Sequence, residues 1–182
     1  MDDFIEIIPD VISAENCSKI VQALENKLTF VEKYEGAIIR DDSESRKDIS
    51  IFPRNFGSLN FAIELVEEAL LNNPSKYKKD NNKYLFSNWK FQKSSAGGGF
   101  YDWHTEQGKS ENIDVTSRFM VWMIYLNTVE KGGKTEFKYQ KKAVKPEAGT
   151  LVLWPAGYSH VHRAAPDLEE DKYIATGWFV FS

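Results

Sequence analysis

The sequence predicts an α+β protein in which N-terminal helices support a double-sheet jelly roll. Apolar residues recur at helical spacing in two stretches before residue 73, whereas from residue 84 onward short aromatic and β-branched runs alternate with glycine, proline and polar turns. With 182 residues, of which 42% are hydrophobic and 14% aromatic, the chain can bury one sizeable core. Helices followed by a series of strands are typical of this fold class, and we expect a single domain over residues 1–182.

Two amphipathic helices are expected near the start, over residues 14–26 and 58–72. Ser13 stands at the N-cap position of the first, where its hydroxyl can accept a hydrogen bond from a backbone N–H of the first turn. We expect both apolar stripes to pack in the core rather than to carry chemistry. They are Cys17, Ile20, Val21 and Leu24 in the first helix and Leu59, Ala62, Ile63, Val66, Ala69 and Leu70 in the second.

Seven strands are expected after the helices, joined by glycine- and proline-containing turns such as 131–133 and 155–157. The polar run from Lys76 to Lys83 is interpreted as a solvated loop. A sandwich of such strands has a mouth, where pockets tend to form. The predicted strands are Tyr84–Gln92, Phe100–Glu106, Arg118–Asn127, Lys134–Tyr139, Thr150–Trp154, His160–Arg163 and Lys172–Phe181.

Charge and cysteine content narrow the function classes. The net charge of −4 and the pI near 5.5 provide no basic field for a nucleic-acid backbone, so a nucleic-acid partner is not expected. Cys17 is the single cysteine, which excludes an intrachain disulfide framework and fits a reducing compartment. No apolar run approaches the roughly 18 residues of a membrane span, and the acidic N-terminus does not resemble a secretory signal. We therefore expect a cytoplasmic protein without a membrane partner.

His104 and Glu106 form the first part of a candidate metal site. If residues 101–106 are extended, these two side chains project from one face. A third ligand comes from His160 or His162, and alternation does not choose between them because both have the same parity. Two imidazoles and a carboxylate suit iron(II) with an open face for substrate and oxygen, and they also suit catalytic zinc.

A series of motifs follows in the second half of the chain, and in this order they make the stretch from Phe91 onward resemble a known family. It is similar to the prolyl 4-hydroxylase-like branch of the 2-oxoglutarate and iron(II) dependent dioxygenases, over about half the chain. The motifs are Gln92 with 97–99, the segment 101–106, Arg118 with 125–127, the segment 132–137, Pro146 with 149–155, and the segment from His162 to Trp178.

The resemblance implies a double-stranded β-helix, the jelly roll of this family, and the cofactors iron(II), 2-oxoglutarate and O2, and it allows ascorbate. It also chooses His162 over His160, because Pro166 then lies at plus four and Lys172 at plus ten, which matches the family spacing. The implied metal and catalytic residues are His104, Glu106 and His162. His160 is assigned a supporting or packing role.

The resemblance further implies a pocket for 2-oxoglutarate. Lys172, Thr176 and Trp178 share one face of the last expected strand, and an ammonium in an apolar wall needs an anion such as the distal carboxylate of the cosubstrate. By similarity Tyr125 offers its phenol to the same carboxylate, with a core aromatic as the alternative. The expected cosubstrate-binding set is Lys172, Tyr125, Trp178, Thr176, Gln92 and Thr135.

The implied function is that of an oxidoreductase which hydroxylates an unactivated C–H bond and releases succinate and CO2. A prolyl residue of a peptide or protein is the first expected substrate. A free amino acid or another small molecule is the alternative, as is a non-catalytic jelly-roll metal-binding protein. Glu106 replaces the usual aspartate of the family and argues against halogenase chemistry. The segments Tyr34–Phe52 and Gln107–Ser117 are candidate rims of the substrate site.

Overall fold

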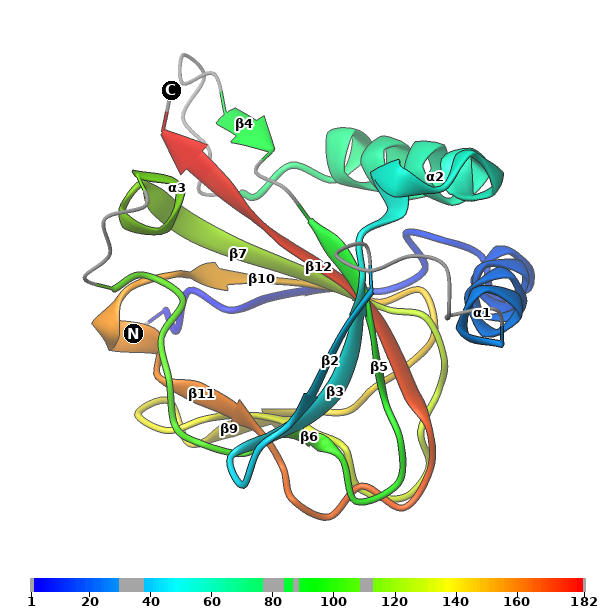
Figure 1. The fold of residues 1–182 in the computed structure, drawn as a ribbon. Helices are drawn as coiled ribbons and strands as arrows, with labels where there is room; N and C mark the ends of the chain where they lie inside the picture. The colour runs from blue at the N-terminus through cyan, green and yellow to red at the C-terminus, as the bar shows by residue number, and fades with distance from the viewer. Residues whose placement is uncertain (1, 30–37, 77–83, 87–88, 109–112, 182) are drawn as a thin grey trace.

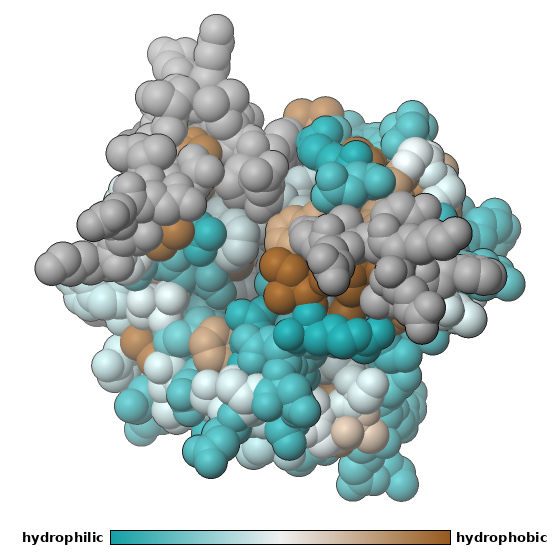
Figure 2. Space-filling view, viewed as in Figure 1, coloured by the Kyte–Doolittle hydropathy of each residue, from teal (hydrophilic) through white to brown (hydrophobic). Residues whose placement is uncertain are grey.

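The computed structural model describes residues 2–29, 38–76, 84–86, 89–108 and 113–181. Most of the structure is antiparallel sheet with few helices. Residues 77–83 of the predicted polar loop, 34–37 of one candidate rim and 109–112 of the other lie outside the described residues. The face drawn in Figure 2 is largely hydrophilic with scattered hydrophobic residues, in agreement with the low hydropathy of the sequence.

Two sheets form the body of the fold. Within the described residues a nine-stranded sheet runs in the order β1, β10, β7, β12, β5, β3 and β2, with β4 paired to β12 and β6 paired to β3. A second sheet has the order β11, β8, β9. The strands are β1 (Glu6–Ile8), β2 (Ile38–Asp42), β3 (Arg46–Ile51), β4 (Tyr84–Phe86), β5 (Lys90–Ser94), β6 (Gly99–Phe100), β7 (Arg118–Tyr125), β8 (Thr135–Phe137), β9 (Lys142–Val144), β10 (Leu151–Pro155), β11 (His162–Ala164) and β12 (Lys172–Phe181).

The larger sheet is covered on both faces, as Figure 1 shows: α1 and α2 lie on one side and the smaller sheet on the other. Strand β7 illustrates the consequence, because Trp122 and Ile124 join the core under the helices whereas Val121, Met123 and Tyr125 join the core between the sheets. Successive side chains of a strand point to opposite faces, so a strand buried on both faces reads as a continuous apolar run.

Helix α1 spans Ala14–Leu28 and α2 spans Asn60–Asn72, where the sequence predicts helices over 14–26 and 58–72. The Ser13 hydroxyl accepts a hydrogen bond from the backbone N–H of Asn16 at 3.2 Å, which is the expected N-cap. Cys17 lies fully buried in the helix-side core. Short helical turns complete the list: η2 (Pro53–Asn55), η3 (Gly57–Leu59), α3 (Ile113–Thr116) and η4 (Tyr158–His160). No described helix has the length and apolar character to span a bilayer.

Several predicted strand boundaries are wrong. The sequence predicts a strand over Phe100–Glu106, but β6 ends at Phe100 and His104 forms only an isolated bridge with His162. The prediction of a strand from His160 fails because residues 158–160 form a 3-10 turn, so β11 begins at His162. Residues 87 and 88 of the predicted strand Tyr84–Gln92 lie outside the described residues, and the described rest of that segment forms β4 and the start of β5, with Trp89 in neither strand.

Strands β1, β2, β3 and β9 are not predicted by the sequence. The hairpin of β2 and β3 lies in the segment interpreted as a charged rim, and its residues are mixed polar and apolar because β2 is the edge of the sheet. Such a strand lacks the clean alternation that identifies a half-buried strand. The hairpin brings charged side chains of β3 next to β5, which places them beside the site described below.

Candidate metal centre

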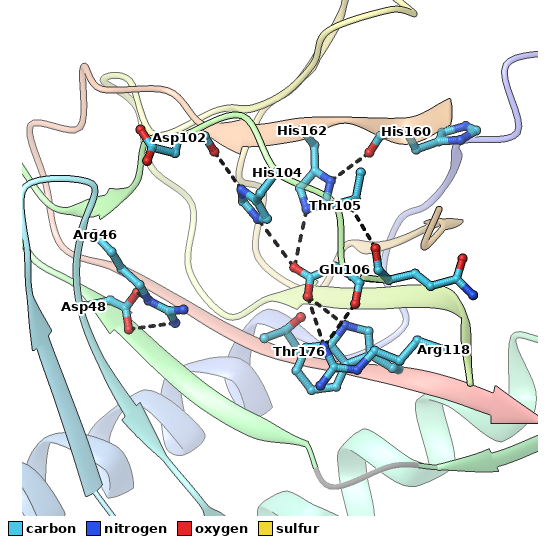
Figure 3. Close-up of polar contacts among 12 residues, drawn as sticks. Arg46, Asp48, Asp102, His104, Thr105, Glu106, Arg118, His160, His162 and Thr176 are labelled. Atoms are coloured by element: carbon cyan, nitrogen blue, oxygen red, sulfur yellow. Dashed lines mark hydrogen bonds and ion pairs between the residues drawn. The ribbon is translucent and has the colours of Figure 1, made fainter. Parts of the chain in front are cut away.

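Three ligand atoms converge at one point between the two sheets (Figure 3). The Nε2 atoms of His104 and His162 lie 3.5 and 3.6 Å from Oε1 of Glu106, and all three donor atoms lie within 4.8 Å of one another. The backbones of His104 and His162 exchange two hydrogen bonds, each 3.0 Å long. This bridge joins the segment after β6 to the first residue of β11, so two parts of the chain that are 58 positions apart meet at the site.

Both imidazole rings are oriented by backbone carbonyls. The Nδ1 of His104 lies 2.7 Å from the carbonyl oxygen of Asp102, and the Nδ1 of His162 lies 2.9 Å from that of His160. A carbonyl only accepts, so in each neutral ring Nδ1 carries the proton and the lone pair of Nε2 is available to a metal. Hydrogen bonds of this kind fix the tautomer and direction of a ligand histidine.

Glu106 divides its two carboxylate oxygens between two tasks. Oε2 accepts a hydrogen bond from the indole Nε1 of Trp178 at 3.0 Å and lies 3.5 Å from Nη1 of Arg118, which stacks on the Trp178 ring. Oε1 faces the two histidines. Burial acts to raise the pKa of Glu106, but hydrogen bonds and charge interactions with His104 and His162 hold that pKa well below its usual range. The carboxylate is therefore ionised at neutral pH.

These residues fit an iron(II) ion. Two neutral imidazole nitrogens and one carboxylate oxygen are the donor set of non-heme iron oxygenases, and the side away from the ligands opens into a cavity. His160 points away from this cluster in Figure 3. Its Nε2 lies 2.9 Å from the carbonyl oxygen of Asp3, and its Nδ1 lies 2.9 Å from the hydroxyl of Ser159. The structure thus brings His162, and not His160, to Glu106.

The cavity beside the ligands has a volume of about 330 Å³. Five of the six residues that the sequence assigns to the cosubstrate line it: Gln92, Thr135, Lys172, Thr176 and Trp178. Tyr125 does not. It is fully buried behind the wall, and its hydroxyl lies 2.7 Å from that of Thr135, so any contact with a ligand would pass through the threonine.

Lys172 is a buried cation in the wall of the cavity, with 6% of its surface exposed. Its ammonium donates to the carbonyl oxygen of Gly133 at 2.9 Å, and no carboxylate in the described part of the chain forms an ion pair with it. Burial lowers the pKa of Lys172 to about 8, against the opposing charges of Asp167 and Asp48. A buried ammonium with a neutral partner is a ready binding group for an anion.

Sequence reasoning missed Lys90 as a cation of the same cavity, and it included Arg46 only as part of the candidate rim Tyr34–Phe52. Lys90 lies two positions before Gln92 on β5, so both side chains point to the same face, and this alternation was the signal that could have found it. Arg46 comes from β3, which the sequence does not predict. Arg118 is part of a motif noted above, but only the structure shows that it contacts Glu106.

Comparisons with known proteins agree with the geometry. A sequence model of the 2OG-Fe(II) oxygenase superfamily matches residues 89–180. Prolyl 4-hydroxylase subunit alpha-3 of Bos taurus is 29% identical over 93 residues, which are 44% of this chain and 17% of that protein. The chain thus spans less than a fifth of the length of this relative.

Three solved structures share the fold. A viral collagen prolyl hydroxylase from Paramecium bursaria Chlorella virus 1 has a TM-score of 0.67 at 20% identity, covering 98% of this chain and 97% of that chain. A prolyl hydroxylase from Trichoplax adhaerens, in complex with a hypoxia inducible factor peptide fragment, has a TM-score of 0.71 at 16% identity, covering 98% and 84%. A prolyl 4-hydroxylase from Pseudomonas putida has a TM-score of 0.68 at 17% identity, covering 98% and 93%.

The family match runs from Trp89, the residue before β5, to Val180 in β12. It includes the three converging ligands. The likeness to prolyl hydroxylases extends over nearly the entire fold. On this evidence the chain belongs to the 2OG-Fe(II) oxygenase superfamily, whose cofactors are iron(II), 2-oxoglutarate and O2, and it shares its fold with prolyl hydroxylases.

Proposed function

We propose that this protein hydroxylates an unactivated C–H bond, with a prolyl residue of a peptide or protein as its first substrate class. One observation carries the proposal: the ligand atoms of His104, Glu106 and His162 converge on the wall of a cavity in which Lys172 supplies a buried cation. A metal hydrolase would need the three converging ligands but not the buried lysine, so Lys172 favours the oxygenase over a zinc enzyme.

In this proposal the Nε2 atoms of His104 and His162 and Oε1 of Glu106 hold iron(II). The bound iron and 2-oxoglutarate supply the oxidation, in which one oxygen atom of O2 enters the C–H bond and the other enters succinate as CO2 leaves. The protein would contribute the donor set that holds the iron and a cavity beside it for the cosubstrate and substrate.

The cosubstrate lies, in this proposal, between the iron and Lys172. The ammonium of Lys172 binds its distal carboxylate, and the hydroxyl of Thr135 lies on the same wall with Tyr125 behind it. Thr176 donates its hydroxyl to the carbonyl of Trp122 at 3.1 Å, so it lines the pocket without a free donor. We propose that the two sheets act as a double-stranded β-helix that holds these groups, with α1 and α2 as external supports.

A peptide substrate is supported by the relatives. The Trichoplax structure contains a peptide fragment, and the viral and bovine relatives are named for prolyl hydroxylation. A small-molecule substrate such as a free amino acid is the alternative within the same chemistry. A non-catalytic jelly roll is disfavoured, because a protein that had lost the reaction would be free to lose a ligand or the pocket lysine.

The first experiment is an anaerobic titration of the purified protein with iron(II) and 2-oxoglutarate. We expect a visible charge-transfer band that saturates at one equivalent of iron. His162→Ala should abolish the band and His160→Ala should retain it, because only the first removes a ligand atom. Absence of the band in the unmodified protein would contradict the proposal. Peptides and amino acids scored by mass for one added oxygen atom would then separate the substrate classes.

A further inference from the structure

The cavity wall carries more positive than negative charge. Its cationic side chains are Arg46, Lys90, Arg118, Arg163 and Lys172, and Glu106 is the one carboxylate among the described lining residues. Two of these cations are matched by a carboxylate just outside the lining. Arg46 pairs with Asp48 at 2.7 Å and Arg163 pairs with Glu136 at 2.8 Å. Arg118 stacks on Trp178 and lies near Glu106.

Lys90 is different from these arginines. Its ammonium donates to the hydroxyl of Ser50 at 2.8 Å, and within residues 2–29, 38–76, 84–86, 89–108 and 113–181 it forms no ion pair with a carboxylate. Burial lowers the pKa of Lys90 to about 8; Arg46 adds to the lowering, and Asp48 and Glu106 oppose it. Lys90 is thus a largely buried cation with a neutral hydroxyl as its partner, directed into the cavity.

Lys90 lies at the metal end of the cavity, away from Lys172. On the paired strands β5 and β12, Lys90 lies opposite Thr176 and Lys172 lies opposite Ser94. The backbone positions of the two lysines are therefore four residues apart along the strand direction. That separation is roughly 13 Å of strand, more than the length of a five-carbon diacid. Thr176, opposite Lys90, is two residues from Trp178, whose indole donates to Glu106. Lys90 therefore lies at the same end of the strands as the metal ligands.

The iron and the cosubstrate leave Lys90 without a counter-charge. Iron(II) carries two positive charges and 2-oxoglutarate two negative charges, and the charge of Glu106 is matched by the nearby Arg118. Two positive charges of the wall, those of Lys172 and Lys90, therefore remain in excess, and only Lys172 is assigned to the distal carboxylate of the cosubstrate. A second anion is needed to match the ammonium of Lys90, and the remaining component of the reaction is the substrate to be hydroxylated.

We propose that Lys90 binds a carboxylate of the substrate, and that the enzyme acts on a carbon close to an acidic group. This inference rests on the proposed function and narrows its substrate class. Two sources share the chemistry: the side chain of an aspartate or glutamate next to the proline of a peptide, or the α-carboxylate of a free amino acid. Ser50 lies behind the ammonium, because its hydroxyl accepts from Lys90 and donates to Asp48 at 3.5 Å.

The test measures binding without turnover. Protein loaded anaerobically with iron(II) and 2-oxoglutarate is titrated by calorimetry with two matched pairs of probes, each pair differing by one charge. The first pair is N-acetyl-aspartyl-proline amide and its asparaginyl counterpart, with the reversed dipeptides alongside. The second pair is free proline and prolinamide. We expect the carboxylate member of at least one pair to bind about ten- to hundred-fold more tightly than its amide.

Substitutions then assign the preference to Lys90. Lys90→Met should remove the preference for the acid, and Lys90→Arg should retain most of it because the charge is kept. Lys19→Met, which removes an exposed lysine of α1, is the control for net charge and should change nothing. The affinity for 2-oxoglutarate should stay the same in all three variants, since that ligand is assigned to Lys172.

The outcomes separate the two proposals. If the charge-transfer band forms but no probe carboxylate is preferred over its amide, the Lys90 assignment is wrong while the oxygenase proposal stands. An acid preference that survives Lys90→Met, or a Lys90→Met variant whose main loss is 2-oxoglutarate affinity, also overturns it. Failure to form the band contradicts the oxygenase proposal itself, and the probe titrations on metal-free protein then still report whether Lys90 selects a carboxylate.

Discussion

Each of the three proposed metal ligands is oriented by a contact on the side away from the other two. Backbone carbonyls of Asp102 and His160 fix the two imidazoles, and the indole of Trp178 fixes the outer oxygen of Glu106. Trp178 also fixes the direction of the glutamate, which is the residue expected to replace the usual aspartate of the resembled family. One oxygen of the Glu106 side chain reaches the indole, and the other oxygen faces the two histidines.

Trp178→Phe should weaken iron binding while leaving the fold intact. The change keeps the aromatic ring but removes the donor to Oε2 of Glu106, and loss of such an outer contact typically costs about ten- to hundred-fold in metal affinity. Anaerobic iron titration measures the effect. The matched control is Trp154→Phe, because Trp154 also lines the cavity but its indole N–H has no hydrogen-bond partner among the described residues. Equal iron affinity in the two variants would refute the role given to Trp178.

Lys172 should make 2-oxoglutarate binding sensitive to pH. Its pKa is lowered to about 8, so the ammonium is present below that pH and is lost as the pH rises through it. We expect 2-oxoglutarate affinity, measured anaerobically with iron, to be level below pH of about 7 and to fall by at most tenfold per pH unit above about 8. Lys172→Arg should flatten the profile, since arginine keeps its charge, and Lys172→Met should lower the affinity at every pH. An unchanged profile in Lys172→Arg would show that another group titrates.

Among the elements that build the site, β12 is predicted by the sequence, whereas the conformation of the segment 101–106 is not. Lys172, Thr176 and Trp178 lie an even number of residues apart on β12, so their placement on one face follows from the sequence. The segment 101–106 does not form the predicted strand. His104 and Glu106 share the site because a single bridge to β11 anchors His104 and the carbonyl of Ala156 accepts the backbone N–H of Glu106. Contacts between distant segments leave no periodic signal in the sequence.

Lys90 and Tyr125 show the same limit. Register between strands decides which inward residue meets the cavity, and the sequence does not give the register of β5 against β3, a strand it does not predict. Tyr125 faces inward as alternation requires, yet Thr135 from β8 stands between it and the cavity. Alternation therefore predicts the face of a side chain, but the packing of the opposite sheet decides whether that side chain is exposed to a ligand.

Helix α1 offers a prediction at this scale. Ser13→Ala removes the side-chain acceptor for the N–H of Asn16 and should lower the free energy of unfolding by about 0.5–2 kcal/mol. Urea denaturation measures the loss, and Ser13→Asp should restore it because aspartate also caps. The iron and 2-oxoglutarate band should be the same in all three proteins, since α1 packs on the outer face of the larger sheet. A cap variant with an altered band would show that α1 does more than support the sheet.

In the whole molecule, the proposed metal centre connects the two sheets. His162 belongs to the smaller sheet, Trp178 and Lys172 belong to the larger one, and Glu106 lies in the connection from β6 to β7. The N-terminal segment is tied to the same region, because the carbonyl of Asp3 contacts the ring of His160 and β1 pairs with β10. A ligand that bridges these parts binds the folded protein and has no comparable site in the unfolded chain.

Iron(II) with 2-oxoglutarate should therefore stabilise the entire fold by mass action. At ligand concentrations about 100-fold above the dissociation constant, the free energy of unfolding should rise by about 2.7 kcal/mol. Anaerobic thermal or urea denaturation, with and without a chelator, measures this gain. His104→Ala should fold but show no gain, because one of the three donors is gone, whereas His160→Ala should keep the gain even if its baseline stability is lower. If the chelator leaves the transition of the unmodified protein unchanged, the three side chains do not form a metal centre that links the two sheets.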